Sequence, residues 1–295
     1  MLEPTTKYDI LVAVDGSAES DAAVRWATHE AVLRDASVAL MHVVAPVVVG
    51  WPVRPLQASF DEWQEDNARH VIEQAQKTFH ASLSGAKTPA VRAAVKHSPV
   101  VDTLINASRE AQMVVVVSHG MSALGRGVLG SVSSGLVHHA HCSVTVVHAD
   151  EAQAPDLTSP VLLGIDGSPA SELATTLAFD EASRRGVDLV ALHAWSDVGI
   201  FPSLGDWRQY EDEGHEVLAE RLAGWQEQYP DVHVRRRIVR DRPARWLLDE
   251  SEQAQLVVVG SHGRGGFKGM LVGSVSTKVA EGAKAPVIVA RTKLA

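Results

Sequence analysis

The sequence contains a single cysteine, Cys142, among 295 residues, so no disulfide can form within the chain. We expect Cys142 to be a small core residue in a reducing compartment. Long apolar runs are also missing: the stretch 43–53 is interrupted by prolines and falls short of the roughly 20 residues that span a bilayer. The first residues leave no room for a signal peptide. We therefore expect a cytoplasmic protein with no membrane insertion.

Positive charge is scarce relative to negative charge. The chain has 27 Lys and Arg against 36 Asp and Glu, a formal net charge of −9 at pH 7. Sequence-independent binding to nucleic acid or to anionic lipid depends on clustered Lys and Arg. The one arginine run, 235–237, falls in an expected strand, whose side chains alternate between two faces. We therefore expect no nucleic acid partner.

Two familiar phosphate-binding motifs do not account for this chain. No Gly-x4-Gly-Lys-Ser/Thr segment occurs, so the lysine of a P-loop is missing. The run 125–130 spells Gly-x-Gly-x-x-Gly, but it lies well past its strand and lacks an acidic ribose partner at the expected distance. We therefore set the dinucleotide interpretation aside.

The chain repeats itself, which indicates a duplicated domain. The first half contains Val12-Ala13-Val14-Asp15-Gly16-Ser17, Met41-His42-Val43, Ser118-His119-Gly120 and Gly130-Ser131-Val132-Ser133; the second contains Leu163-Gly164-Ile165-Asp166-Gly167-Ser168, Leu192-His193-Ala194, Ser261-His262-Gly263 and Gly273-Ser274-Val275-Ser276. We place the domains at 1–150 and 161–295. The acidic, proline-flanked segment 151–160 has no periodicity and is the expected linker.

Each half alternates short apolar runs with segments of helical periodicity. In the first half, strands are expected at 10–14, 38–44, 91–95, 113–117 and 144–147. Strands that alternate with helices predict an α/β fold in which a five-stranded parallel sheet carries helices on both faces.

A glycine-rich loop follows the buried run 257–259 in the second half. The glycines of this loop are Gly260, Gly263 and Gly273. Nine residues separate the last two, and Ser274, which follows Gly273, can begin a helix. Glycines let backbone N–H groups approach phosphate oxygens, and the positive end of the next helix attracts the same charge. The segment is typical of a phosphate-binding loop.

The spacing Gly260-x2-Gly263-x9-Gly273-Ser274 resembles the nucleotide-binding signature of the universal stress protein family. The resemblance extends to Asp166 and to 192–194, and it covers both halves, so the chain is identified as a tandem member. It implies two Rossmann-like (adenine nucleotide alpha hydrolase-like) domains with strand order 3-2-1-4-5. Open α/β sheets bind ligands at the topological switch, here between strands 1 and 4.

The resemblance implies ATP as the ligand, with Mg²⁺ as a candidate companion ion. Asp166 would accept hydrogen bonds from ribose hydroxyls, although a helix cap explains the same residue. Ala194 and Val43 match the position whose backbone pairs with adenine. The remaining implied site positions are Gly164, Gly260, Ser261, His262, Gly263, Arg264, Gly273, Ser274, Val275 and Ser276 in the second half, and Ala13, Asp15, Gly120, Gly130, Ser131, Val132 and Ser133 in the first.

Two histidine groups allow other interpretations. His138, His139, His141 and Cys142 have spacings that a metal site could use, but the second half carries no such residues, and we expect a helix-end histidine group and no metal. His119 and His262 could act as acids or bases. No nucleophile or carboxylate accompanies them by motif, so we expect them to shape their loops and we assign no catalytic residue.

Three functions remain open. The leading hypothesis is an ATP-binding regulatory or stress-response protein that binds nucleotide and does not turn it over rapidly. The alternatives are a slow ATPase or phosphoryl-transfer enzyme of the same fold group, and a nucleotide-free assembly module. The resemblance to family dimers also implies that the last strands, 144–147 and 287–290, pack edge to edge, and that the chain forms a homodimer through such edges.

The two halves differ at one position of the signature. Val117 stands where the second half has Gly260, while the other signature positions match. A branched Cβ disfavours positive φ and close ligand approach, whereas Val117 is harmless if only the backbone N–H at this position matters. We expect the former, with one well-bound ATP in the second half and a weaker or empty first site. Valine at Gly260 or Gly273 is expected to abolish binding in the second half and to leave the fold mostly intact.

Overall fold

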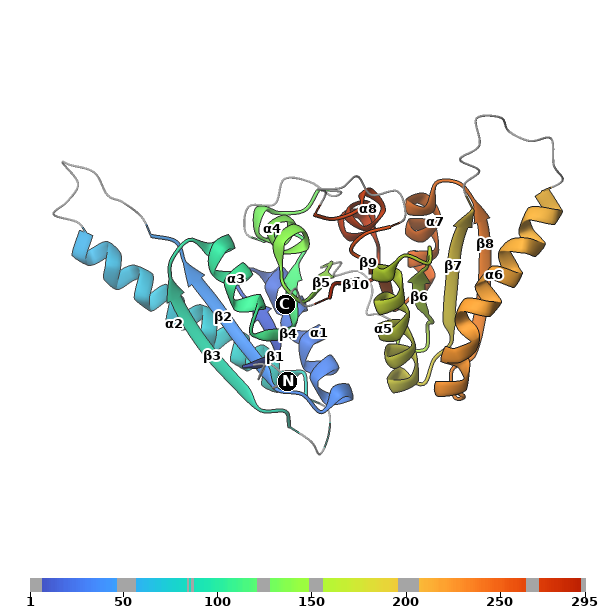
Figure 1. The fold of residues 1–295 in the computed structure, drawn as a ribbon. Helices are drawn as coiled ribbons and strands as arrows, with labels where there is room; N and C mark the ends of the chain where they lie inside the picture. The colour runs from blue at the N-terminus through green and yellow to red at the C-terminus, as the bar shows by residue number, and fades with distance from the viewer. Residues whose placement is uncertain are drawn as a thin grey trace, which may run out of the picture. The chain divides into compact units, whose positions relative to one another are not determined.

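The computed structural model describes residues 7–46, 57–83, 85, 88–120, 128–148, 156–195, 207–263 and 271–292 (Figure 1). The chain divides into two compact units, Met1–Ala149 with Lys293–Ala295, and Asp150–Thr292. In the part of the chain that the structure describes, no helix is both long enough and apolar enough to cross a membrane.

The first unit alternates strands and helices along the chain. Its elements are β1 (Tyr8–Ala13), α1 (Ala18–Arg34), β2 (Val38–Val44), α2 (Gln57–Ala81), β3 (Val91–His97), α3 (Val100–Ser108), β4 (Ala111–Val117), α4 (Ser131–His139) and β5 (Ser143–Val147). These strands lie in the order β3-β2-β1-β4-β5, and each neighbouring pair is parallel. The register pairs Val12 of β1 with Leu40 of β2 and with Val115 of β4.

The second unit has the same plan. Its elements are β6 (Val161–Gly164), α5 (Pro169–Arg185), β7 (Leu189–Trp195), α6 (Trp207–Gln228), β8 (Val234–Arg240), α7 (Pro243–Glu250), the short 3₁₀ helix η2 (Ser251–Gln253), β9 (Leu256–Gly260), α8 (Ser274–Gly282) and β10 (Val287–Ala290). Its strands lie in the order β8-β7-β6-β9-β10, again with parallel neighbours. The α/β fold and the implied strand order are therefore confirmed in each unit.

Helices cover both faces of each sheet. In the first unit α1 packs against α2 and α3 packs against α4. Because β-α-β crossovers are right-handed, the two connections that lead from β1 to β2 and β3 lie on one face, and those that lead to β4 and β5 lie on the other. The topological switch point, where the order of strand addition reverses, therefore lies between β1 and β4. The corresponding point of the second unit lies between β6 and β9.

Burial explains why the inner strands are continuously apolar. All seven residues of β2 and all five of β9 are buried, whereas β3 and β8 at the outer edges carry exposed arginines such as Arg92 and Arg235. Strands covered on both faces need apolar side chains throughout, and outer strands need them on fewer positions. The arginines of β8 form ion pairs: Arg235 with Asp188, and Arg237 with Glu250.

The helices that follow the first strand of each unit begin and end with matched signals. Ser17 and Ser168 are the N-caps of α1 and α5, and each side chain accepts a hydrogen bond from the backbone N–H three residues later. Asp35 and Gly186 end the same helices in the left-handed region, at φ 54° and 64°.

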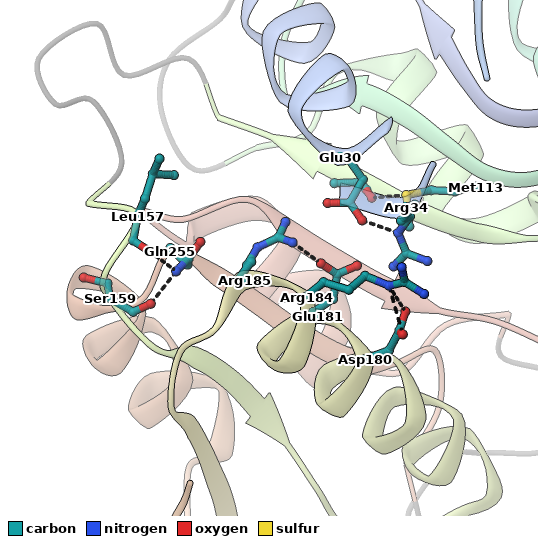
Figure 2. Close-up of polar contacts among 11 residues, drawn as sticks. Glu30, Arg34, Met113, Leu157, Ser159, Asp180, Glu181, Arg184, Arg185 and Gln255 are labelled. Carbon is teal, nitrogen blue, oxygen red and sulfur yellow. Dashed lines mark hydrogen bonds and ion pairs between the residues drawn. The ribbon is translucent and has the colours of Figure 1, made fainter. Parts of the chain in front are cut away.

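Both helices also carry an ion pair that involves a buried glutamate in their last turn. Glu30 pairs with Arg34, and Glu181 pairs with Arg185 (Figure 2). The two glutamates are fully buried, and the side chain of Arg185 is only 4% exposed. A buried carboxylate needs a cationic partner, so these arginines are part of the packing of each unit.

The second unit begins before β6. Gln255 Nε2 donates to the backbone oxygens of Leu157 and Ser159, at 2.8 and 2.5 Å (Figure 2). Residues 157–159, part of the expected linker, are thereby held at the start of β9; its residues 151–155 lie outside the described residues.

Candidate functional site

The turn after the first strand of each unit carries the acidic residue expected at the site. In the first unit, Asp15 Oδ1 accepts hydrogen bonds from Ser17 N and Oγ, at 3.0 and 2.6 Å. In the second, Asp166 Oδ1 accepts one from Ser168 N at 2.9 Å. The serine N–H orients each carboxylate at the start of a helix, where the dipole favours negative charge.

The loop after the fourth strand lies directly against this carboxylate in both units. An ideal Cβ built on Gly263 would lie 2.5 Å from Asp166 Oδ2, and a Cβ on Gly120 would overlap Asp15 Oδ2. A side chain at either position would have to displace the carboxylate from the loop. The structure brings together the acidic residue and the Ser-His-Gly loop that the sequence predicted for one site.

The helix that follows the loop is attached to the same place. Gly273 N donates to Ser261 O at 2.7 Å, and a Cβ on Gly273 would lie 3.6 Å from Gly263 N. In the first unit, Gly130 N donates to Ser118 O at 2.8 Å. Each of these glycines is the N-cap of its helix, α8 or α4. Carboxylate, loop and helix amino terminus are thus contiguous in each unit.

The first turn of each of these helices offers free backbone donors. The described residues show no hydrogen bond from the N–H groups of Ser131, Val132 and Ser133, or from those of Ser274, Val275 and Ser276. Such groups, together with the positive helix end, form an anion-binding site when they face a ligand.

Ser133 and Ser276, the third residues of α4 and α8, already donate hydrogen bonds from their hydroxyls. Ser276 Oγ donates to Gly260 O at 2.5 Å, and Ser133 Oγ donates to Val117 O at 2.6 Å. Both serines are buried. Their hydroxyls hold the helix start against the end of the fourth strand, which leaves their N–H groups as the atoms available to a ligand.

The positions expected at the adenine end lie on the neighbouring strand. Val43 is the penultimate residue of β2, and Ala194 has the same place in β7. Ala13 and Gly164 end β1 and β6 beside them. All four are therefore at the carboxyl edge where the loops lie.

Histidines link these strand ends, a feature that the sequence motifs did not predict. The rings of His42 and His193 lie with Nδ1 2.8 Å from Val14 O and 2.7 Å from Ile165 O. A carbonyl oxygen can only accept, so Nδ1 carries the proton in both rings. The recurrence of Leu/Met-His-Val/Ala in the two halves was the sequence signal that could have identified them.

The loop histidines bind their own neighbours. His262 Nδ1 lies 3.1 Å from Ser261 Oγ, and His119 Nδ1 lies 3.1 Å from Ser118 Oγ. His119 Nε2 is buried with no hydrogen-bond partner among the described residues. These contacts fit a role in shaping the loops.

The difference between Gly260 and Val117 has a packing basis. A Cβ on Gly260 would lie 2.7 Å from the backbone C and O atoms of Ala170 and 2.9 Å from Ser171 N, in the first turn of α5. Side chains essentially never approach backbone this closely. Gly260 is therefore required by helix packing, and the expectation that Gly260→Val leaves the fold mostly intact is not supported by this geometry. Gly273 has only ordinary contacts, at 3.6 Å or more.

Two further expectations concern the phosphate contact of Arg264 and the histidine and cysteine residues near position 140. Arg264 lies outside the described residues, so its expected contact with phosphate stays a prediction. Among the described residues, no group of three or more His, Cys, Asp or Glu side chains is arranged to hold a metal ion, and Cys142 is buried ahead of β5.

Comparison with known proteins places the chain in a family. The model of the universal stress protein family matches residues 8–148 and 158–291. A universal stress protein of Mycolicibacterium smegmatis is 60% identical over 294 residues, which cover 99% of this chain and 100% of that protein. A universal stress protein from Archaeoglobus fulgidus shares the fold at 20% identity, with a TM-score of 0.68 over 97% of this chain and 99% of that one.

One shorter neighbour was crystallised with a ligand. A universal stress protein whose crystal structure is described as a complex with cAMP is 23% identical and covers 48% of this chain and 98% of its own, with a TM-score of 0.35.

The duplicated α/β units, the two family matches and the 60% identity over the full length agree. The chain belongs to the universal stress protein family, as a tandem member.

Proposed function

We propose that the chain binds ATP at the carboxyl edges of its sheets, as a regulatory stress protein that does not turn the nucleotide over rapidly. The proposed domains are 1–150 and 161–295, each with one site. The proposed contacts are Asp15 or Asp166 with ribose, the backbone of Val43 or Ala194 with adenine, and the first turn of α4 or α8 with phosphate. Arg264 is proposed as a further phosphate contact.

The observation that carries the proposal is the contiguity of an acceptor and a donor set. Asp166 Oδ2 lies against Gly263, Gly263 N lies against Gly273, and Gly273 begins a helix with free N–H groups. A ribose needs an acceptor for its hydroxyls, and a phosphate needs several N–H donors without intervening side chains. The arrangement places the carboxylate acceptor and the N–H donors next to one another.

The proposal of binding without rapid turnover rests on the chemistry of the described side chains. Phosphoryl transfer usually requires a lysine or arginine clamp, carboxylates for Mg²⁺ and a base or water-positioning group. The carboxylate that lies against the loop is Asp15 in the first unit and Asp166 in the second. Because Mg²⁺ in nucleotide sites is often held by one or two carboxylates together with phosphates, these residues could bind a Mg²⁺ that arrives with the nucleotide.

Calorimetric titration of the purified protein with ATP, ADP and cAMP tests the proposal. We expect saturable binding of ATP and its loss in Gly273→Val, because the valine side chain would stand where phosphate meets backbone. An unchanged affinity in this variant would overturn the placement of the site. Mass spectrometry that finds no nucleotide on the purified protein, with no binding by calorimetry, would favour the nucleotide-free assembly module.

A steady-state ATPase assay separates binding from catalysis. Sustained turnover near about one per second would be in the range of ordinary enzymes and would favour the phosphoryl-transfer alternative. We expect turnover far below this value.

We further propose that the protein is cytoplasmic and forms a homodimer through last-strand edges. Short apolar strands at a sheet edge are prone to pair with another chain. Sedimentation velocity over a range of protein concentrations tests the dimer: a single species with the mass of one chain at all concentrations would contradict it.

A further inference from the structure

The N-cap serines of α1 and α5 make different contacts although their sequences match. Ser17 Oγ donates to Asp15 Oδ1 at 2.6 Å, within its own turn. Ser168 Oγ donates to His262 O at 3.1 Å, in the loop after β9. Both hydroxyls also accept from the N–H of the helix, from Ser20 N at 3.1 Å and Ser171 N at 3.2 Å. Only the partner of the hydroxyl proton differs.

The packing of the helices gives a reason for this difference. The first turn of α5 reaches so close to Gly260 that no Cβ could stand there. Val117 has a real Cβ at the matching place, so the corresponding turn of α1 must lie farther from β4. Close packing of α5 against β9 brings Ser168 within hydrogen-bond distance of the loop that begins at Ser261.

We propose that Ser168 is a positioning residue of the second site, and that Gly260 acts by letting α5 approach β9 closely enough for this hydrogen bond to form. The bond joins the turn that carries Asp166 to the loop that carries Gly263. The first unit has no counterpart of this bond among its described residues, since Ser17 donates to Asp15. The inference rests on the proposed function for its consequence, though not for the contact itself.

The expected consequence is a more ordered site in the second unit. A loop that is already held in place loses less conformational freedom when a ligand binds. The proposal therefore explains a preference for the second site by preorganisation. In this proposal Gly260 serves helix packing, whereas the sequence pattern suggested backbone conformation or close ligand approach as its role.

Hydrogen exchange on the nucleotide-free full chain tests the contact directly. We compare Ser168→Ala with Ser17→Ala, a matched control that loses the same capping bond to the helix. We expect amides of residues 261–263 to exchange about threefold to tenfold faster in Ser168→Ala, the effect of losing one ordinary hydrogen bond. Residues 118–120 should be unchanged in Ser17→Ala. Equal changes in both loops, or none in either, would overturn the proposal.

A conservative variant separates positioning from general destabilisation. Ser168→Thr keeps a hydroxyl at the N-cap and should restore exchange at 261–263 to the parent rate, within about twofold. Exchange that stays as fast as in Ser168→Ala would show that the hydroxyl does not hold the loop.

Nucleotide affinity then tests the link to function. Ser168→Ala should weaken the tighter ATP-binding event by about threefold to tenfold, and Ser17→Ala should leave it unchanged. If the parent protein binds no nucleotide, the proposed function fails while the exchange results still decide the role of Ser168. If nucleotide binds and Ser168→Ala changes exchange without changing affinity, the positioning role fails and the proposed function stands.

Discussion

Gly120 and Gly263 leave room for a neighbouring carboxylate, and neither is needed for its own backbone angles. Neither has a positive φ, yet a Cβ on either would meet the carboxylate of Asp15 or Asp166. The carboxylate must stay beside the loop if it is to serve the same ligand. A single methyl group is therefore enough to test this arrangement.

Gly263→Ala should displace the carboxylate of Asp166 and weaken ATP binding in the second unit. Moving one charge-assisted hydrogen bond out of place is worth about 1.5–3 kcal/mol, or roughly tenfold to a hundredfold in affinity. Calorimetry measures the change. Gly224→Ala is the control, because a Cβ there has no neighbour within 4 Å. If both variants bind as the parent does, Asp166 does not contact the ligand.

At the scale of helices and strands, Gly260 and Gly273, two of the three signature glycines of the second unit, have different structural roles. Gly260 lies at the end of β9 under the backbone of α5, whereas Gly273 begins α8 with ordinary contacts. Substitution at the first position affects how a helix packs on the sheet. Substitution at Gly273 affects the point where the loop joins α8.

Gly260→Val and Gly273→Val should therefore be distinguishable by stability. We expect Gly260→Val to lower the free energy of unfolding by about 1–3 kcal/mol through overpacking against Ala170, and Gly273→Val to change it much less. Denaturant unfolding measures both. Equal stabilities would show that α5 shifts without cost and would remove the packing explanation.

The ion pairs of the buried glutamates in α1 and α5 are a second feature at this scale. Glu181→Ala removes the carboxylate that pairs with the guanidinium of Arg185, whose side chain is 4% exposed. Breaking a buried pair from one side typically costs about 3–5 kcal/mol. The exposed pair of Arg245 and Asp249, 3.7 Å apart, is the control, and Asp249→Asn should cost less than about 1 kcal/mol. Similar losses of unfolding free energy in the two variants would contradict the role assigned to burial.

At the scale of the whole molecule, the two units share a fold but differ at the strand end beside their sites. Val117 and Gly260 occupy matching positions, and the serine contacts differ accordingly. The duplication therefore predicts two sites of unequal affinity in one chain.

We expect one tightly bound ATP per chain, held by the second unit, and a weaker first site. Neither Val117 nor Gly260 has a positive φ, so backbone strain does not explain the difference; the loss of one ordinary hydrogen bond to the loop would weaken the first site by about threefold to tenfold. Calorimetric titration of the parent and of Val117→Gly measures the stoichiometry and both affinities. The glycine should strengthen the weak event. Two equivalent sites in the parent protein, or a first site that Val117→Gly leaves unaltered, would show that the asymmetry has no functional weight.

The sequence by itself determined the fold class, the duplication and the family. Apolar runs such as 113–117 and 257–259 can only be buried between two layers, and the repeated Asp-Gly-Ser and Ser-His-Gly segments mark strand ends. These features are local or periodic along the chain, so reading the residues in order reveals them.

Only the tertiary structure decided how those segments meet. Asp166 and Gly263 are far apart in sequence, and no local pattern states that a carboxylate fills the place of a side chain on that glycine. The same holds for Ser168 and His262, and for the contact of Gly260 with Ala170. Such contacts depend on how closely a helix packs on a sheet, a distance that is set by every side chain between them and by none of them alone.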